Sequence, residues 1–116
     1  MIMEIETLDI KSDMPPAPLA RANLEIEIER LVKTETKLIK VIHGYGSHGV
    51  GGEIKKEVNL LLKHLLKKGV IKDYINCEKM SESYIQRKAL YDNFPSLVLD
   101  SDLKNYNSGI TLIFLK

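Results

Sequence analysis

The residues best suited to bind a ligand lie in one short segment, LIKVIHGYGSHGVGGE, which runs from Leu38 to Glu53. Five of the seven glycines fall in it, directly after the apolar run 38–42 and directly before a helical pattern. Glycine accepts positive φ angles and lets a backbone approach a ligand closely, so this turn can direct several N–H groups outward. The N-terminus of the following helix adds about half a positive charge. We therefore predict that the turn binds a phosphate group.

The charge of the chain supports an anionic ligand at this turn. The formal net charge is only +1, but residues 33–72 hold nine lysines and three glutamates. The three histidines, His43, His48 and His64, lie in the same segment. A polyanion would meet an attractive potential there. Lysines also cover the wet face of ordinary amphipathic helices, so the basic segment by itself leaves both interpretations open.

Length and composition predict one domain that spans residues 1–116. The hydrophobic content of 44% is enough for a single core at this size. No stretch approaches the roughly 20 apolar residues of a membrane span, and the N-terminus is acidic where a signal peptide would be basic, so we expect a cytoplasmic protein without a membrane partner. The single cysteine, Cys77, excludes an intramolecular disulfide and argues against a zinc site. We expect it to be a small buried or half-buried hydrophobe.

Hydrophobic periodicity predicts an alternation of strands and helices. The predicted strands are residues 3–10, 38–43, 70–75 and 110–115, and the predicted helices are residues 19–33, 50–68 and 81–91. The helix 50–68 has a continuous apolar stripe, and Gly69 follows its basic last turn as a C-terminal cap. The helix 19–33 is less distinct, because residues 24–29 also alternate as a strand would. Residues 78–107 form an irregular insertion with a short helix.

Two motifs in this arrangement resemble those of the Smr (small MutS-related) domain. That family has a central His-Gly-x-Gly after an apolar strand and a closing Gly-x-Thr strand. Here the central motif is VIHGYG at 41–46 and the closing motif is SGIT at 108–111. The resemblance covers nearly the whole chain apart from the insertion. It implies an α/β fold of the α+β two-layer type, similar to the C-terminal domain of bacterial translation initiation factor three, with a mixed four-stranded sheet and two main helices in the order βαβαββ.

The resemblance also implies binding of DNA or RNA and, as in several members of the family, endonuclease activity. The family's opening motif, Leu-Asp-Leu-His-Gly, corresponds to LDIKS at 8–12, where the aspartate is kept and the histidine is replaced by lysine. The candidate catalytic residues are therefore Asp9, Lys11 and His43. A lysine with a pKa of about 10.4 is a poor general base at pH 7, although it can hold a phosphate or stabilise transition-state charge.

The candidate binding residues surround the central motif. Each has a simpler alternative: the histidine as a core hydrogen-bonding group, the tyrosine as a ring lying over its own loop, the lysines as ordinary surface residues. The nucleic-acid contacts that we predict are His43, Gly44, Tyr45, Gly46, Lys55 and Lys56.

Three further functions compete with a non-catalytic nucleic-acid module. The first is an active DNA or RNA endonuclease that uses Asp9 and His43, for which a divalent metal ion would be the one expected cofactor. The second is a protein-interaction module. The third is a dinucleotide site, because residues 44–49 satisfy G-x-G-x-x-G, but the acid expected about 20 residues further on is missing. The sequence does not distinguish DNA from RNA and does not determine the oligomeric state.

Overall fold

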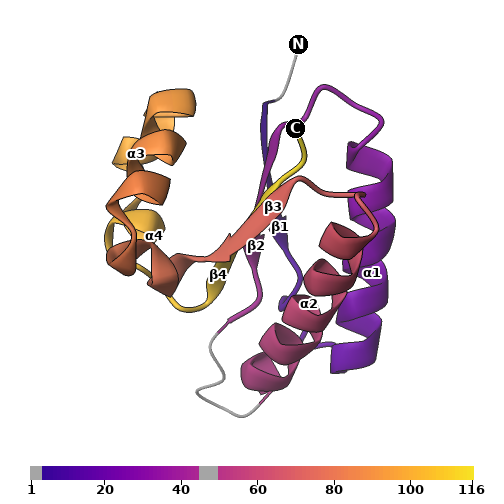
Figure 1. The fold of residues 1–116 in the computed structure, drawn as a ribbon. Helices are drawn as coiled ribbons and strands as arrows, with labels where there is room; N and C mark the ends of the chain where they lie inside the picture. Colours follow the sequence, from indigo (N-terminus) through magenta and orange to yellow (C-terminus); the bar gives the residue numbers. More distant parts are fainter. Residues whose placement is uncertain (1–3, 45–49) are drawn as a thin grey trace.

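The computed structural model describes residues 4–44 and 50–116, and Figure 1 shows a mixed sheet between two layers of helices. The strands are β1 (Ile5–Asp9), β2 (Leu38–Ile42), β3 (Asp73–Asn76) and β4 (Ile110–Phe114). Their order in the sheet is β1-β2-β4-β3, with β1 parallel to β2 and β4 antiparallel to both β2 and β3. The predicted mixed four-stranded α/β fold and its βαβαββ order are confirmed.

The helices form two separate layers (Figure 1). They are α1 (Ala17–Leu31), α2 (Val50–Lys67), η1 (Cys77–Glu82), α3 (Tyr84–Asn93), η2 (Pro95–Leu99) and α4 (Ser101–Lys104). The two main helices, α1 and α2, cover one face of the sheet. The insertion, from η1 to α4, adds a further layer on the opposite face. Among the described residues, no helix has the length and apolar character needed to cross a bilayer.

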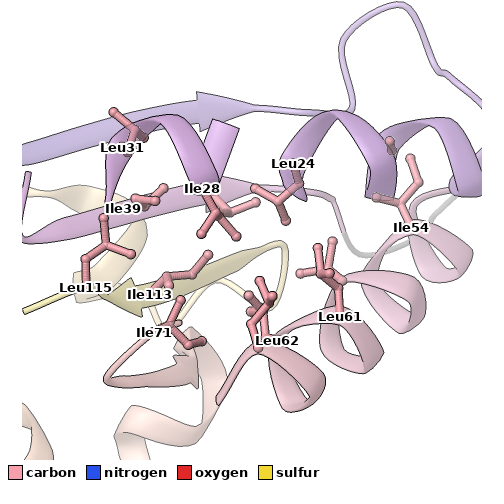
Figure 2. Close-up of a cluster of buried hydrophobic side chains, with 14 of the residues drawn as sticks. Leu24, Ile28, Leu31, Ile39, Ile54, Leu61, Leu62, Ile71, Ile113 and Leu115 are labelled. Atoms are coloured by element: carbon pink, nitrogen blue, oxygen red, sulfur yellow. The ribbon is translucent and has the colours of Figure 1, made fainter. Parts of the chain in front are cut away.

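The core beneath α1 and α2 is aliphatic. Figure 2 shows Leu24 and Ile28 of α1 meeting Leu61 and Leu62 of α2, and all four side chains are fully buried. Ile26, between the two buried α1 residues, is 62% exposed. Spacing of buried residues by four, with the intervening apolar residue in solvent, is the helical pattern and not the strand pattern. The ambiguity of residues 24–29 is thereby resolved in favour of the predicted helix.

The ends of these helices follow local chemistry. Pro16 is the N-cap of α1, and a proline occupies its first turn, where the missing N–H breaks no helical bond. Gly69 adopts a φ of 77° after α2, and the Val70 N–H donates to the Leu65 carbonyl at 2.9 Å. This confirms Gly69 as the left-handed cap that the sequence predicts.

The core beneath the insertion is mixed in character. Its apolar members come from the sheet and from every segment of the insertion, and include Leu38, Ile75, Cys77, Met80, Leu90, Phe94, Leu97, Leu103, Ile110 and Leu112. Cys77 is fully buried, as predicted, and burial raises the pKa of its thiol to about 11. Lys40 of β2 is also only 9% exposed, and its Nζ donates to Asp100 Oδ2 and Asp102 Oδ2, each at 2.8 Å.

Candidate nucleic-acid interface

The parallel pairing of β1 and β2 brings the opening and central motifs together. Asp9, the last residue of β1, is in register with Ile42, the last residue of β2. Because parallel strands end at the same edge of a sheet, the turn that follows Asp9 lies beside the turn that begins at His43. We call this the turn edge: Asp9 to Ser12, His43, Gly44 and the first two turns of α2. The three candidate catalytic residues, Asp9, Lys11 and His43, all belong to it.

Asp9 closes the first of these turns. Its Oδ1 accepts the backbone N–H groups of Lys11 at 3.0 Å and Ser12 at 3.1 Å. This is the local side-chain-to-backbone bonding through which aspartate favours turns. Both Asp9 and Lys11 are exposed. The observed role of Asp9 is therefore to shape the backbone that presents Lys11.

His43 does not face solvent, and its direct contact with a ligand stays a prediction. The side chain is fully buried, with Nδ1 2.7 Å from the Gly44 carbonyl oxygen and Nε2 2.7 Å from Thr111 Oγ1. Both ring nitrogens are therefore engaged inside the protein. The simpler alternative, a core histidine with satisfied hydrogen bonds, describes this ring. Its role at the turn edge is to hold the Gly44 backbone in position.

The amides of the central motif are partly used as well. The backbone N–H groups of His43 and Gly44 both donate to the Gly109 carbonyl oxygen, at 2.9 and 3.1 Å. Gly44 therefore contributes to the site through its conformation, with a φ of 79°, and not through a free N–H. Tyr45, Gly46 and His48, the other motif positions considered in the sequence, lie outside the described residues.

The closing motif supports the central one through two residues. A Cβ on Gly109 would lie 3.1 Å from the Gly44 Cα and 3.2 Å from its carbonyl carbon, so a side chain there would press on backbone. Thr111, two residues on, provides the hydroxyl that contacts the His43 ring. The Gly-x-Thr pattern is thus explained by packing against His43 and Gly44.

A chain of hydrogen bonds continues from the His43 ring to α2. Thr111 Oγ1 donates to Asn76 Oδ1 at 2.7 Å, and Asn76 Nδ2 donates to Asn59 Oδ1 at 2.8 Å. Asn59 Nδ2 then donates to the Lys55 carbonyl oxygen at 2.8 Å. Sequence reasoning missed Asn59, Asn76 and Thr111 as supporting residues. Only Thr111 had a signal, as part of the closing motif, because isolated asparagines 17 residues apart show no pattern.

The number of protons in this chain depends on the charge of His43. Five contacts run in series from the Gly44 carbonyl oxygen to the Lys55 carbonyl oxygen. Both ends of the chain therefore only accept hydrogen bonds. Thr111 and each asparagine amide supply one proton along the chain, whichever way the amides are turned. A neutral imidazole supplies one more, which leaves one contact without a proton. An imidazolium supplies two, and every contact is then a hydrogen bond.

The surroundings of the ring oppose that second proton. Burial lowers the pKa of His43, and the positive charge of Lys55 lowers it further. The hydrogen bond to the Gly44 carbonyl and the negative charge of Glu78 act in the opposite direction but do not outweigh burial. The pKa of His43 therefore lies below its ordinary value, and the neutral ring is favoured at pH 7.

Lys55 is held internally, and its contact with a phosphate stays a prediction. Its Nζ donates to Glu78 Oε1 at 2.5 Å and to the Ser108 carbonyl oxygen at 2.9 Å. The side chain is 22% exposed, and this pair ties α2 to the insertion. Lys56, the next residue, is exposed and remains available to a ligand.

No group of three or more histidine, cysteine, aspartate or glutamate side chains suited to a metal ion occurs among residues 4–44 and 50–116. Comparisons of the chain with protein-family models, with curated proteins and with solved structures gave no match. The resemblance to the Smr domain accordingly rests on the motifs at 8–12, 41–46 and 108–111.

Proposed function

We propose that this protein is an Smr-like nucleic-acid-binding module that holds the sugar-phosphate backbone of DNA or RNA at its turn edge. One observation carries the proposal: the register of Asp9 with Ile42, which sets the Lys11 turn beside the His43-Gly44 turn. The N-terminus of α2 lies at the turn edge, and its partial positive charge favours a phosphate group.

The proposed contacts differ from the supporting residues. Lys11 and Lys56 are exposed and are the side chains that we propose to contact phosphates. His43 and Lys55 act behind them, because their polar atoms are engaged with Gly44, Thr111, Glu78 and the Ser108 backbone. Contacts from Tyr45 and Gly46 remain predictions from the sequence, since both lie outside the described residues.

An endonuclease is the second candidate function, favoured by the exposure of Asp9 at the turn edge. The family's Asp-x-His pair is here Asp9 and Lys11, and the enclosed His43 ring has no route to a substrate proton in this geometry. Such an enzyme would depend on Asp9, and on a divalent metal ion for charge stabilisation. Binding without cleavage is therefore the primary proposal.

The binding test is fluorescence anisotropy with labelled duplex DNA, branched DNA and structured RNA over a range of salt concentrations. Lysine contacts release counterions, so we expect affinity to fall steeply with salt. The Lys11→Ala/Lys56→Ala double variant should bind more weakly and reduce the logarithmic salt slope by about 2, one for each contact. Lys67→Ala/Lys68→Ala is the matched control, because these lysines follow about 27 Å of helix from the α2 N-terminus.

Two results of this test would oppose binding at the turn edge. One is no binding to any of the three nucleic acids at low salt, after which a protein-interaction module becomes the better hypothesis. The other is an equal loss of affinity in the two double variants, which would indicate an attraction spread over the whole basic segment.

A cleavage assay on the same substrates separates the two candidate functions. With Mg²⁺ or Mn²⁺ present, a non-catalytic module yields no product. Product formation that is lost in Asp9→Asn, while binding persists, would support the endonuclease. Asparagine keeps an oxygen acceptor for the Lys11 and Ser12 N–H groups, so the turn should survive this substitution.

A further inference from the structure

A cavity of about 440 Å³ lies between α3 and the sheet, at the edge opposite the turn edge. Its lining includes Glu4 and Lys37, which precede β1 and β2, and Phe114, which ends β4. Strands that end at the turn edge begin here, so the cavity and the turn edge are at opposite ends of the sheet. Figure 1 shows α3 on the face away from α1 and α2. We call this space the α3 cavity.

The inner wall of the α3 cavity is apolar. Ile75 and Phe114 line it from the sheet, and Met80, Leu90 and Phe94 line it from the insertion. Four of these five side chains are less than one-tenth exposed, and Phe114 is half-buried. A volume of this size is within the usual range for small-molecule sites, roughly 300–1,000 Å³. The cavity is therefore suited to an apolar group of moderate size.

The rim of the cavity is predominantly basic on the side of the sheet. Lys37, Lys72 and Lys116 line it there, together with the acids Glu4 and Asp73. Glu4 meets Lys37 at 3.4 Å, but both side chains are about half exposed, so this ion pair is weak. No ion pair of Lys72 occurs within the described parts of the chain. On the α3 side the polar rim residues are the uncharged amides Gln86 and Asn93.

We propose that the α3 cavity binds a small amphipathic acid, with its hydrocarbon body against Ile75, Leu90 and Phe94 and its anionic head at the lysine rim. An apolar wall with a few polar groups at its mouth fixes the orientation of such a ligand. Lysine supplies charge-assisted hydrogen bonds to a carboxylate or a phosphate alike. A sugar would leave its hydroxyl groups without partners against this wall. A hydrocarbon cation would meet three ammonium groups against two carboxylates, those of Glu4 and Asp73.

Calorimetric titration with octanoate and octyl phosphate tests the proposal. Both should bind, and the tighter of the two identifies the preferred head group. Octylamine, with the same chain and the opposite charge, should bind at least about tenfold more weakly, equivalent to roughly 1.4 kcal/mol. Failure of both acids to bind, or equal affinity for octylamine, would overturn the proposal. The measurement uses no nucleic acid, so its outcome is independent of the function proposed for the turn edge.

Two pairs of variants locate the binding. Ala89 is exposed on α3 and lines the cavity, so Ala89→Trp should fill the space and abolish octanoate binding. Ala22→Trp, at an exposed position of α1 on the other face, should leave it unchanged. Lys72→Ala should weaken binding by about tenfold, as expected for one charge-assisted contact. The matched control, Lys63→Ala on α2, should not weaken it.

The lysine variants keep the test valid if Ala89→Trp misfolds. Lys72 and Lys63 are both exposed, so their substitution leaves the core unchanged. Octanoate binding that survives both Ala89→Trp and Lys72→Ala would show that the acid binds elsewhere and would contradict the proposal.

Discussion

Lys40 lies at the centre of β2 and His43 directly follows the strand, and both are buried bases, yet their pKa values move in opposite directions. Burial lowers the pKa of each side chain. For Lys40, hydrogen bonds to Asp100 and Asp102 and the charges of these carboxylates outweigh burial, and the net pKa is raised. For His43 the main hydrogen-bond acceptor is the neutral Gly44 carbonyl, and the net pKa is lowered. The difference lies in the partners, not in the strand.

The partners come from different parts of the chain. Lys40 points to the insertion face, where Asp100 and Asp102 approach from 60 and 62 residues further along the sequence. His43 points to the face of α2, where Thr111, Asn76 and Asn59 offer uncharged groups. A charged base on one face and a neutral base on the other follow from these two environments. The two bases are thus held differently, Lys40 through ion pairs to the insertion and the His43 ring through hydrogen bonds to uncharged groups.

The largest expected effect is the loss of the Lys40 ammonium. Lys40→Ala leaves the Asp100 and Asp102 carboxylates without their cation, and we expect the free energy of unfolding to fall by about 2–3 kcal/mol. This is below the figure for a fully enclosed pair, because the Asp102 side chain is 38% exposed. Urea unfolding measures the change.

Two further variants sharpen this test. Lys88→Ala removes an exposed ion pair with Asp92 in the same insertion and should cost at most about 0.5 kcal/mol. Lys40→Met combined with Asp100→Asn and Asp102→Asn should recover most of the lost stability, since no charge then lacks a partner. Equal losses in Lys40→Ala and Lys88→Ala would mean that the buried pair contributes no more than a surface one.

The next effect concerns the backbone contact that supports His43. Gly109→Ala introduces a methyl group at 3.1 Å from the Gly44 Cα, and overpacking of this kind costs about 1–3 kcal/mol. We expect a loss of about 2 kcal/mol by urea unfolding, with amide chemical-shift changes at His43 and Gly44.

Gly69→Ala is the control for this substitution, because its Cβ would meet nothing within 4 Å and only its φ of 77° is unfavourable. We expect a loss of about 1 kcal/mol there and no change at His43. A Gly109→Ala variant as stable as the original protein would contradict this prediction. It would show that the Gly109 and Gly44 backbones can move apart without loss of stability.

The smallest effect is a pH dependence of stability from His43. Because its pKa is lowered in the folded protein, the unfolded chain binds a proton below about pH 6.5 that the folded protein does not bind. The free energy of unfolding therefore keeps its full value above that pH. It declines as the pH falls through and below it. His43→Gln should reduce this slope, measured as the free energy of unfolding between neutral and mildly acidic pH.

His64→Gln, at an exposed position of α2, is the matched control and should leave the slope in place. An unchanged slope in His43→Gln would contradict a lowered pKa of the buried ring. A steeper slope would favour the imidazolium form, in which all five contacts of the hydrogen-bond chain carry a proton, because the folded protein would then bind that proton more tightly than the unfolded chain.

Local patterns predicted the regular elements well and their boundaries less well. The helix expected at 50–68 is α2, Val50–Lys67, because its apolar stripe and its Gly69 cap are both local signals. The strand expected at 70–75 begins only at Asp73, because Val70 bonds back to the end of α2 and Ile71 packs beneath the helices. The helix expected at 81–91 begins at Tyr84, where the Ser83 side chain accepts the Gln86 N–H as its N-cap.

The insertion was the part that local patterns described least. Residues 96–99 lie within η2, and residues 100–109 contain the short helix α4. Neither has a strong period of its own. Their positions depend on the core under the insertion and on the Lys40 ion pairs, which join residues far apart in the sequence.

The sequence by itself determined the order of strands and helices, the glycines at the motif positions and the burial of Cys77, because periodicity, backbone freedom and hydrophobicity act over a few residues. Only the tertiary structure decided that the His43 ring is enclosed, that Lys55 is engaged with Glu78 and that Lys40 is charged between two carboxylates. These properties depend on which distant side chains surround a group, and burial and neighbouring charge are established only when the chain has folded.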